Sequence, residues 1–292
     1  FVFMSDRFGD QARYSASAAA MAIEAIPSKG RKGATEATAG RAVAVTGRNI
    51  AAARHAAYWL VLVSGFVEPL LYLLSIGVGV GALIGGFTIN GTPVKYAAFV
   101  APAMLATSAM NGAIAETSMN FFGKMKYMKL YDGVIATPVT PFEIAAGELL
   151  WALIRGAVYS VAFLVIMVAT GLTTPLRALA AFPVTVLVGL AFGAIGMVLA
   201  TFLRSWQDFD YLMIIQMAMF LFSGTFVPAS GYHPVLRIIV ECTPLYHGVT
   251  LLRAITTWTM DWGALVNVGY LVVVTGIGLS IAARRTSRLL CT

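Results

Sequence analysis

Long apolar runs alternate with short polar segments along most of the chain. Six of these runs approach the length of about 20 mostly apolar residues that a helix needs to cross a membrane. They cover about residues 56–84, 96–121, 144–169, 179–203, 211–226 and 264–283. The pattern predicts an all-α membrane protein with six transmembrane helices.

The segment between the fifth and sixth runs is apolar, but helix-breaking residues interrupt it. Glycine and proline recur in FSGTFVPASGYHP (residues 222–234), and Pro244 and Gly248 break the stretch that follows. Glycine and proline end or bend helices. Irregular backbone inside a membrane is tolerated where protein covers it or water reaches it. We therefore expect a pair of re-entrant half-helices here rather than a seventh span.

The first apolar run is preceded by two segments of different character. Residues 1–39 are expected to form a flexible cytoplasmic segment. In residues 40–55, Arg41, Arg48 and His55 recur every seven residues and therefore share one helical face. This pattern predicts an interfacial helix on the cytoplasmic surface, with an ordinary solvated lead-in as the alternative. The transmembrane domain then covers residues 40–285, and residues 286–292 form a short basic tail.

The composition and the placement of charge support a membrane protein. Only 11% of the residues are charged, whereas soluble domains carry roughly a quarter. If the amino terminus is cytoplasmic, the outer segments hold four cations: Lys95, Arg177, Arg237 and Arg253. Counted from residue 29 onward, the inner segments then hold thirteen: Lys29, Arg31, Lys32, Arg41, Arg48, Arg54, Lys124, Lys126, Lys129, Arg204, Arg284, Arg285 and Arg288. The positive-inside rule therefore places both termini in the cytoplasm, and the net charge of +7 needs no nucleic acid to explain it.

One polar segment, residues 122–143, lies on the cytoplasmic side between the second and third runs. In KMKYMKLYDGVIATP, Met128, Tyr131 and Ile135 share a helical face. Asp132-Gly133 marks a turn, and two Thr-Pro pairs fix the entry into the third run. A stiff amphipathic knob of this kind is suited to docking a soluble partner. The alternative is a basic loop that only obeys the positive-inside rule and touches anionic lipid.

Ionisable side chains inside membrane spans are costly and mark candidate functional positions. Glu148 and Arg155 lie seven residues apart on one face of the third span, about 10 Å along the helix axis. These groups either form ion pairs between helices or line a polar path for a substrate headgroup. The substrate-pathway candidates are Glu68, Glu116, Glu148, Trp151, Arg155 and Tyr159. The two cysteines are far apart and form no CxxC motif, so no metal site is predicted.

Four stretches resemble the type-2 ABC exporter permeases, within the branch of the nodulation lipo-oligosaccharide and daunorubicin-type exporters. The longest begins YAAFVAPAMLATSAMNG and runs through the polar segment to LLWALIRG. The others are VEPLLYLLSIGVGVG, LFSGTFVP and TPLYHGVTLLRA. They occur in order between about residues 40 and 285.

The resemblance implies a role for the polar segment and for the interrupted stretch. In such permeases the cytoplasmic loop after the second span holds a coupling helix that docks on a separate ATP-binding subunit. The implied coupling residues are Met128, Lys129, Tyr131, Asp132, Ile135, Thr137 and Pro138. The interrupted stretch matches the outer re-entrant helices, and the gate candidates are Phe226, Pro228, Pro244, Tyr246 and His247.

The sequence contains no nucleotide-binding loop of its own. A P-loop requires G-x-x-x-x-G-K-[ST], and Gly123-Lys124 is followed by Met125. We therefore expect no cofactor on this chain, with ATP and Mg²⁺ bound by the partner ATPase, two copies of which are expected per complex. The resemblance also implies a second permease chain, identical or related, because six spans form only half a pathway in this family.

The predicted function is the transmembrane subunit of an ATP-driven exporter in the bacterial inner membrane, not an enzyme itself. The substrate is expected to be amphipathic: a lipid-linked saccharide, a glycolipid or a hydrophobic drug. A secondary transporter driven through intramembrane carboxylates is one alternative, although no internal repeat is visible. An intramembrane serine protease is another, but no Gly precedes Ser223 or Ser230 by two residues.

Overall fold

The computed structural model describes residues 34–55, 71, 74, 75, 79, 87–89, 92–135, 137–227, 231–257 and 261–290. Nearly all of the first predicted span, with Glu68, and also Pro228 lie outside these residues. The helices are α2 (Ala34–His55), α5 (Tyr96–Ile114), α6 (Leu130–Ile135), α7 (Pro141–Ala169), α8 (Pro175–Ala200), α9 (Asp208–Phe222), α10 (Pro234–Glu241), α11 (Pro244–Thr257) and α12 (Gly263–Leu290). Two π-helical segments, η2 (Ala115–Asn120) and η3 (Gly123–Tyr127), extend α5, and a hairpin pairs β1 (Phe87–Ile89) with β2 (Thr92–Val94).

Four of the described helices are long and apolar enough to cross a membrane. They cover Tyr96–Tyr127, Pro141–Ala169, Pro175–Ala200 and Gly263–Leu289, and they coincide with the second, third, fourth and sixth predicted spans. The predicted fifth span corresponds to α9, which has only 15 residues. The chain is thus a predominantly helical membrane protein, and its described residues contain four candidate spans, or five if a bent helix pair is counted as one span.

That bent pair is formed by α10 and α11, in the stretch where prolines and glycines predicted two half-helices. The two helices meet at an angle of 83°. Each begins with a proline, Pro234 and Pro244. Proline is favoured at the first helical position because its missing N–H would have no helical acceptor there. The interruption that the sequence predicted is therefore present.

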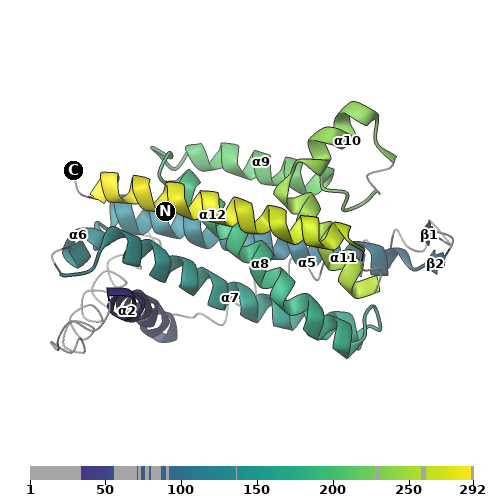
Figure 1. Cartoon of the computed structure of the whole chain (residues 1–292), viewed down its shortest axis with the longest axis horizontal. Helices are drawn as coiled ribbons and strands as arrows, with labels where there is room; N and C mark the ends of the chain where they lie inside the picture. Colours follow the sequence, from purple (N-terminus) through teal and green to yellow (C-terminus); the bar gives the residue numbers. More distant parts are fainter. Residues whose placement is uncertain are drawn as a thin grey trace.

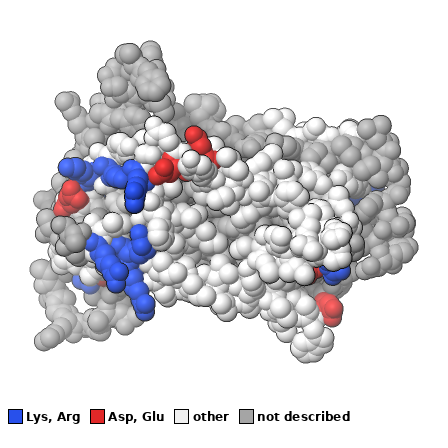
Figure 2. Space-filling model, turned by 90° about the horizontal axis from the view of Figure 1, so that it is seen from above, with Lys and Arg blue, Asp and Glu red and all other residues white. Residues whose placement is uncertain are grey.

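The long helices run side by side along the longest axis of the molecule (Figure 1). At one end lie α2, α6 and the carboxyl end of α12; at the other lie the hairpin, α10 and α11 (Figure 1). Figure 2 shows Lys and Arg gathered at the α6 end, beside a broad belt without charge. The exposed cations of this end are Lys126, Lys129, Arg204, Arg284 and Arg288.

The ends of α7 follow directly from local sequence. Thr140 accepts a hydrogen bond from the Glu143 amide, and the Glu143 carboxylate accepts one from the Thr140 amide, so the two form a capping box. At the other end Gly171 has a φ of 69°. The amides of Gly171 and Leu172 donate to Val168 and Met167, which is the Schellman arrangement that favours glycine at this position.

The second span is the central helix of the bundle. Val100, Leu105 and Met110 are fully buried, whereas α7 and α12 keep exposed valines and isoleucines along their outer faces. In η2, the hydroxyls of Thr117 and Ser118 donate to the carbonyls of Ala113 and Ile114. These hydroxyls satisfy carbonyls in the region where the regular α-helical pattern is interrupted. π-Helical turns of this kind are frequent at functional sites.

Small residues allow α7 and α8 to pack closely within the chain. A Cβ built on Gly193 would lie 2.6 Å from Leu149 Cδ1, and one on Gly189 would lie 3.7 Å from Leu153 Cδ2. Gly193 therefore permits the close approach of α7 and α8 within one chain, whereas the contact at Gly189 is at an ordinary van der Waals distance.

Three features differ from the sequence-based expectations. An all-α chain was expected, but a hairpin is present among the described residues, and Asn-Gly at 90–91 is a strong hairpin signal in the sequence. The basic face of α2 is turned inward, with Arg48 buried, while Val43 is 58% exposed. Finally, α12 continues as helix to Leu290, so most of the predicted tail extends the last span.

Candidate functional site

The knob on α6 connects the second span to α7. Lys129 has a φ of 44°, a left-handed conformation that ends η3 and turns the chain into α6. Asp132, Gly133 and Pro138 are exposed, as is Lys129, while Met128 and Thr137 are half-buried. These residues form the surface of the knob that a partner can touch. The side chain of Ile135 lies outside the described residues.

Tyr131 has no exposed surface. Its ring lies 5.4 Å from that of Phe121 and packs in a cluster with Ile144 and Ala200. The residue therefore shapes the knob from inside the chain. A side chain buried in this way is placed to shape the knob rather than to contact a partner.

The phenol of Tyr131 is buried close to Glu148. Among the described residues its hydroxyl has no partner that meets hydrogen-bond geometry. Burial raises the pKa of Tyr131 well above its ordinary value, and the negative charge of Glu148 raises it further. The phenol therefore stays protonated at neutral pH.

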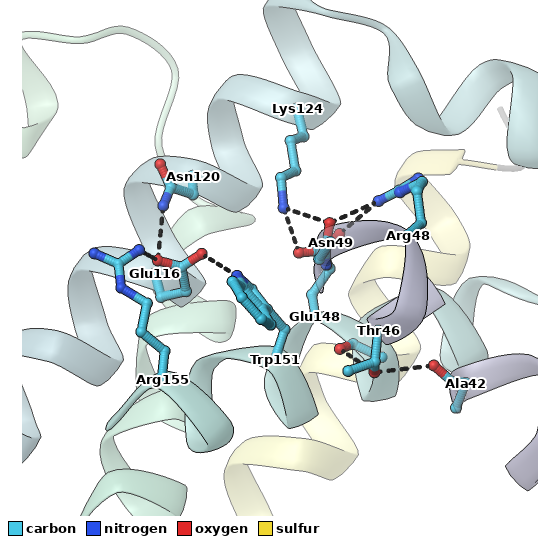
Figure 3. A network of polar contacts seen from close by, with 11 residues as sticks. Ala42, Thr46, Arg48, Asn49, Glu116, Asn120, Lys124, Glu148, Trp151 and Arg155 are labelled. Atoms are coloured by element: carbon cyan, nitrogen blue, oxygen red, sulfur yellow. Dashed lines mark hydrogen bonds and ion pairs between the residues drawn. The ribbon is translucent and has the colours of Figure 1, made fainter. Parts of the chain in front are cut away.

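Glu148, in the second turn of α7, gathers polar groups from two other elements (Figure 3). Arg48 of α2 donates to Glu148 Oε1 at 2.9 Å, and Lys124 of η3 donates to Oε2 at 2.6 Å. Asn49 accepts hydrogen bonds from both cations. The Glu148 side chain is only 2% exposed. One buried carboxylate thus holds α2, α7 and the η3 end of the second span together.

A second polar cluster lies farther along the second span and α7 (Figure 3). Arg155 forms an ion pair with Glu116, and Trp151 Nε1 donates to the other carboxylate oxygen of Glu116 at 2.9 Å. Asn120 donates to Glu116 as well, at 2.8 Å. Arg155 Nε donates to the hydroxyl of Tyr159 at 2.9 Å. The described substrate-pathway candidates lie on η2 and α7 and form two separate clusters, and Glu148 and Arg155 do not pair with each other.

The helices α2 and α7 are in unusually close contact. Arg41 pairs with Glu143 at 2.8 Å, and Thr46 Oγ1 donates to the Gly147 carbonyl at 3.0 Å. A Cβ on Gly147 would lie 2.6 Å from Val45 Cβ, so this position requires glycine. The roles of Arg41, Arg48, Lys124 and Glu143 were not predicted. The sequence signal for these contacts was the presence of two cations, Arg41 and Arg48, on one amphipathic helix and of two carboxylates, Glu143 and Glu148, on another.

At the opposite end, the predicted gate residues lie around α11. Tyr96 donates to the Phe226 carbonyl at 3.2 Å. His247 Nδ1 lies 2.7 Å from Asn267 Oδ1, and its ring stacks on Tyr270 with centroids 3.9 Å apart. Pro244 begins α11, and the ring of Tyr246 contacts the ring of His247 edge-on.

One further residue at this end was missed by sequence reasoning. Arg253 donates to the carbonyls of Phe99 and Thr225, each at 3.0 Å, and its guanidinium lies 3.7 Å from the centroid of the Phe99 ring. It thereby ties α11 to α5 and to the turn after α9. An arginine within an otherwise apolar stretch was the signal. Within the described parts of the chain, no group of three or more His, Cys, Asp or Glu residues could hold a metal ion.

Comparison with known proteins identifies the family. The sequence model of the ABC-2 type transporter family matches residues 43–257. This chain belongs to the ABC-2 type transporter family. The match extends from α2 to the end of α11 and contains both polar clusters and the α6 knob.

Several relatives within the ABC-2 family carry the same description. The chain is 34% identical over 214 residues to nodulation protein J of Rhizobium leguminosarum bv. trifolii, covering 73% of this chain and 80% of the relative. It is 30% identical over 228 residues to nodulation protein J of Rhizobium meliloti, covering 78% and 84%. A third relative, nodulation protein J of Bradyrhizobium diazoefficiens, is 29% identical over 213 residues, covering 73% and 80%. As a member of this family, the chain is a membrane transporter subunit.

Proposed function

We propose that this ABC-2 chain is the transmembrane subunit of an ATP-driven exporter in the bacterial inner membrane. The observation that carries the proposal is the α6 knob. It presents an exposed polar surface at the basic end of a helical bundle, next to a broad belt of surface without charge on the face that Figure 2 shows. The positive-inside rule makes the basic end cytoplasmic. The α6 knob therefore offers a rigid surface that a cytoplasmic ATPase can bind.

The proposed arrangement has six spans, with both termini in the cytoplasm. The four long helices supply four spans. Residues 56–84 supply the first, and α9 with the turn after it supplies the fifth. The bent pair α10 and α11 is proposed to dip into the membrane from outside as two half-helices. The inward-facing arginines of α2 favour a helix that is fastened to α7 beneath the membrane surface rather than one floating on lipid.

The energy source is proposed to be a separate ATPase, present in two copies and binding ATP and Mg²⁺. The absence of a P-loop motif from this sequence supports this division. The ATPase would contact Lys129, Asp132, Thr137 and Pro138, while Tyr131 holds the knob in shape. Two permease chains, identical or related, would complete the pathway.

The substrate is proposed to be amphipathic: a lipid-linked saccharide, a glycolipid or a hydrophobic drug. The similarity to nodulation proteins favours a saccharide-bearing lipid. In this proposal the Glu116 cluster lies beside the path of the polar headgroup. The residues around Phe226, Tyr246 and His247 form the outer gate. Glu116 and Glu148, the two described glutamates among the pathway candidates, are each paired with a cation. This pairing disfavours a secondary transporter.

The proposal is tested by purifying the chain with its ATPase and reconstituting the complex in proteoliposomes. ATP hydrolysis and ATP-dependent movement of a glycolipid to the outer leaflet are the expected results. A variant that carries Asp132→Ala with Pro138→Ala, two exposed positions at the proposed ATPase contact, should lose ATP-driven transport. Transport without ATP, or driven by a proton gradient alone, would refute the proposed mechanism.

A further inference from the structure

The helices α2 and α7 form one rigid unit at the cytoplasmic end. An added Cβ on Gly147 would lie 2.8 Å from the Ala42 carbonyl oxygen, so the two backbones are nearly in contact. The Thr46 hydrogen bond and the Arg41–Glu143 pair fasten the same surface. Close-packed helices with interlocked backbones resist sliding. Arg48 and Glu148 therefore belong to one body and move together.

The cytoplasmic end of the second span forms the other body, and Lys124 makes the polar contact with the first body that lies nearest α6, beyond the Glu116 cluster. The Lys124 side chain is 18% exposed, whereas those of Arg48 and Glu148 are 5% and 2% exposed. Lysine is a point charge on a flexible stem, so it can leave a carboxylate without disturbing its own helix. Lys124 can therefore reach water more easily than either of its partners.

The α6 knob joins these two bodies along the chain. Lys129 follows the end of η3 at Tyr127, and Pro141 begins α7. The Tyr131 cluster forms the apolar half of the same junction, since it contains Phe121 from the second span and Ile144 from α7. A force on α6 is therefore applied directly across the Lys124–Glu148 contact.

Cations outnumber carboxylates at this junction. Two cations share one buried carboxylate, and a buried carboxylate stripped of every partner is strongly disfavoured. Because Arg48 engages one oxygen of Glu148 and Lys124 the other, loss of Lys124 still leaves a neutral ion pair. Loss of Arg48 leaves Lys124 as the only cation on Glu148.

We propose that the Lys124–Glu148 contact opens when the ATPase displaces α6, and that Arg48 keeps Glu148 paired while it is open. Arg48 and Glu148 are thus positioning residues for the transport cycle. This inference rests on the proposed function, because it requires an ATPase at α6.

The test compares Lys124→Met with Arg48→Met in the complete complex with its ATPase in proteoliposomes. In Lys124→Met the junction has lost its closing contact, so we expect ATP hydrolysis without substrate to rise severalfold and transport per ATP to fall. In Arg48→Met, opening would leave the Glu148 carboxylate buried without a cation. We therefore expect ATP hydrolysis and transport to fall together by about tenfold or more, as a lost interaction of at least 1.4 kcal/mol implies.

Two controls separate this inference from a purely structural role. Arg237→Met removes an exposed pair with Glu241, and such pairs contribute little, so its activity should equal that of the wild type. Both junction variants must also bind the ATPase as the wild type does. Changes of hydrolysis in the same direction in Lys124→Met and Arg48→Met, or failure of either variant to assemble, would overturn the inference. A wild-type complex without ATP-driven transport would instead refute the proposed function.

A distance measurement provides a second readout. Tyr127 on η3 and Phe142 on α7 are 58% and 49% exposed, so spin labels at these positions report the separation of the two bodies. We expect trapping of the ATPase with nucleotide and vanadate to change the label distance in the wild type and to leave it unchanged in Arg48→Met. An unchanged distance in an actively transporting wild-type complex would overturn the inference.

Discussion

Truncation of Tyr131 is expected to release the α6 knob from the bundle, while loss of its hydroxyl alone should do no harm. Tyr131→Ala removes a fully buried ring from the cluster of Phe121, Ile144 and Ala200. Truncations of large buried aromatic side chains to alanine cost about 3–5 kcal/mol. Tyr131→Phe keeps the ring and removes a buried hydroxyl that makes no hydrogen bond to the described residues. Removal of such an unpaired buried hydroxyl leaves the stability of the folded knob unchanged or raises it by about 1 kcal/mol.

The assay is tryptic cleavage after Lys129, which is exposed and adjoins α6. When opening is fast relative to cleavage, the cleavage rate follows the population of the open knob. A cost of 3 kcal/mol or more corresponds to roughly a hundredfold faster cleavage in Tyr131→Ala, since each 1.4 kcal/mol is tenfold. Tyr131→Phe should be cleaved at the wild-type rate or more slowly.

The comparison of the two variants can refute the reasoning. If Tyr131→Phe is cleaved as fast as Tyr131→Ala, the hydroxyl is what matters, through a hydrogen bond to Glu148 or to water. If neither variant differs from the wild type, the ring does not hold the knob.

Three further outcomes are expected. Gly147→Ala should weaken the α2–α7 contact by about 1–3 kcal/mol through overpacking and lower the Tm, whereas Gly156→Ala, in open space, should not; equal Tm values would contradict the close approach. The purified chain without its partner should hydrolyse no ATP in a phosphate-release assay, and any substantial hydrolysis would contradict the assignment of ATP to another chain. Cysteines at residues 30 and 287 should react with an impermeant maleimide only from the cytoplasmic side and a cysteine at Thr92 only from outside; labelling of residue 30 from outside would reverse the topology.

The sequence alone located the described membrane helices and their interruptions. The second, third, fourth and sixth predicted spans coincide with long helices, because span length and hydrophobicity are local properties that the bilayer thickness fixes. The bend between α10 and α11 was also predicted, because proline at residues 234 and 244 restricts the backbone wherever it occurs. The same kind of local signal, Asn-Gly at 90–91, pointed to the hairpin but was not used.

Only the tertiary structure decided which charged side chains meet. Arg48 and Glu148 are 100 residues apart in sequence, and Arg41 and Glu143 are 102 apart. Nothing in their local sequence states that α2 turns its basic face onto α7. The sequence placed Glu148 and Arg155 on one face of a helix, yet the partners supplied by neighbouring helices divided them between two clusters.

The position of Tyr131 illustrates the same limit. The sequence predicted a short helix at this knob, and α6 is present, but Met128 lies outside it because the left-handed Lys129 separates the two. An apolar residue on such a helix can be buried by a partner or by the chain itself. The folded chain buries Tyr131 against Phe121 and Ile144, because the second span and α7 converge beneath α6. Burial is a property of the assembled helices, so the sequence determined the helix and the tertiary structure determined what its aromatic residue touches.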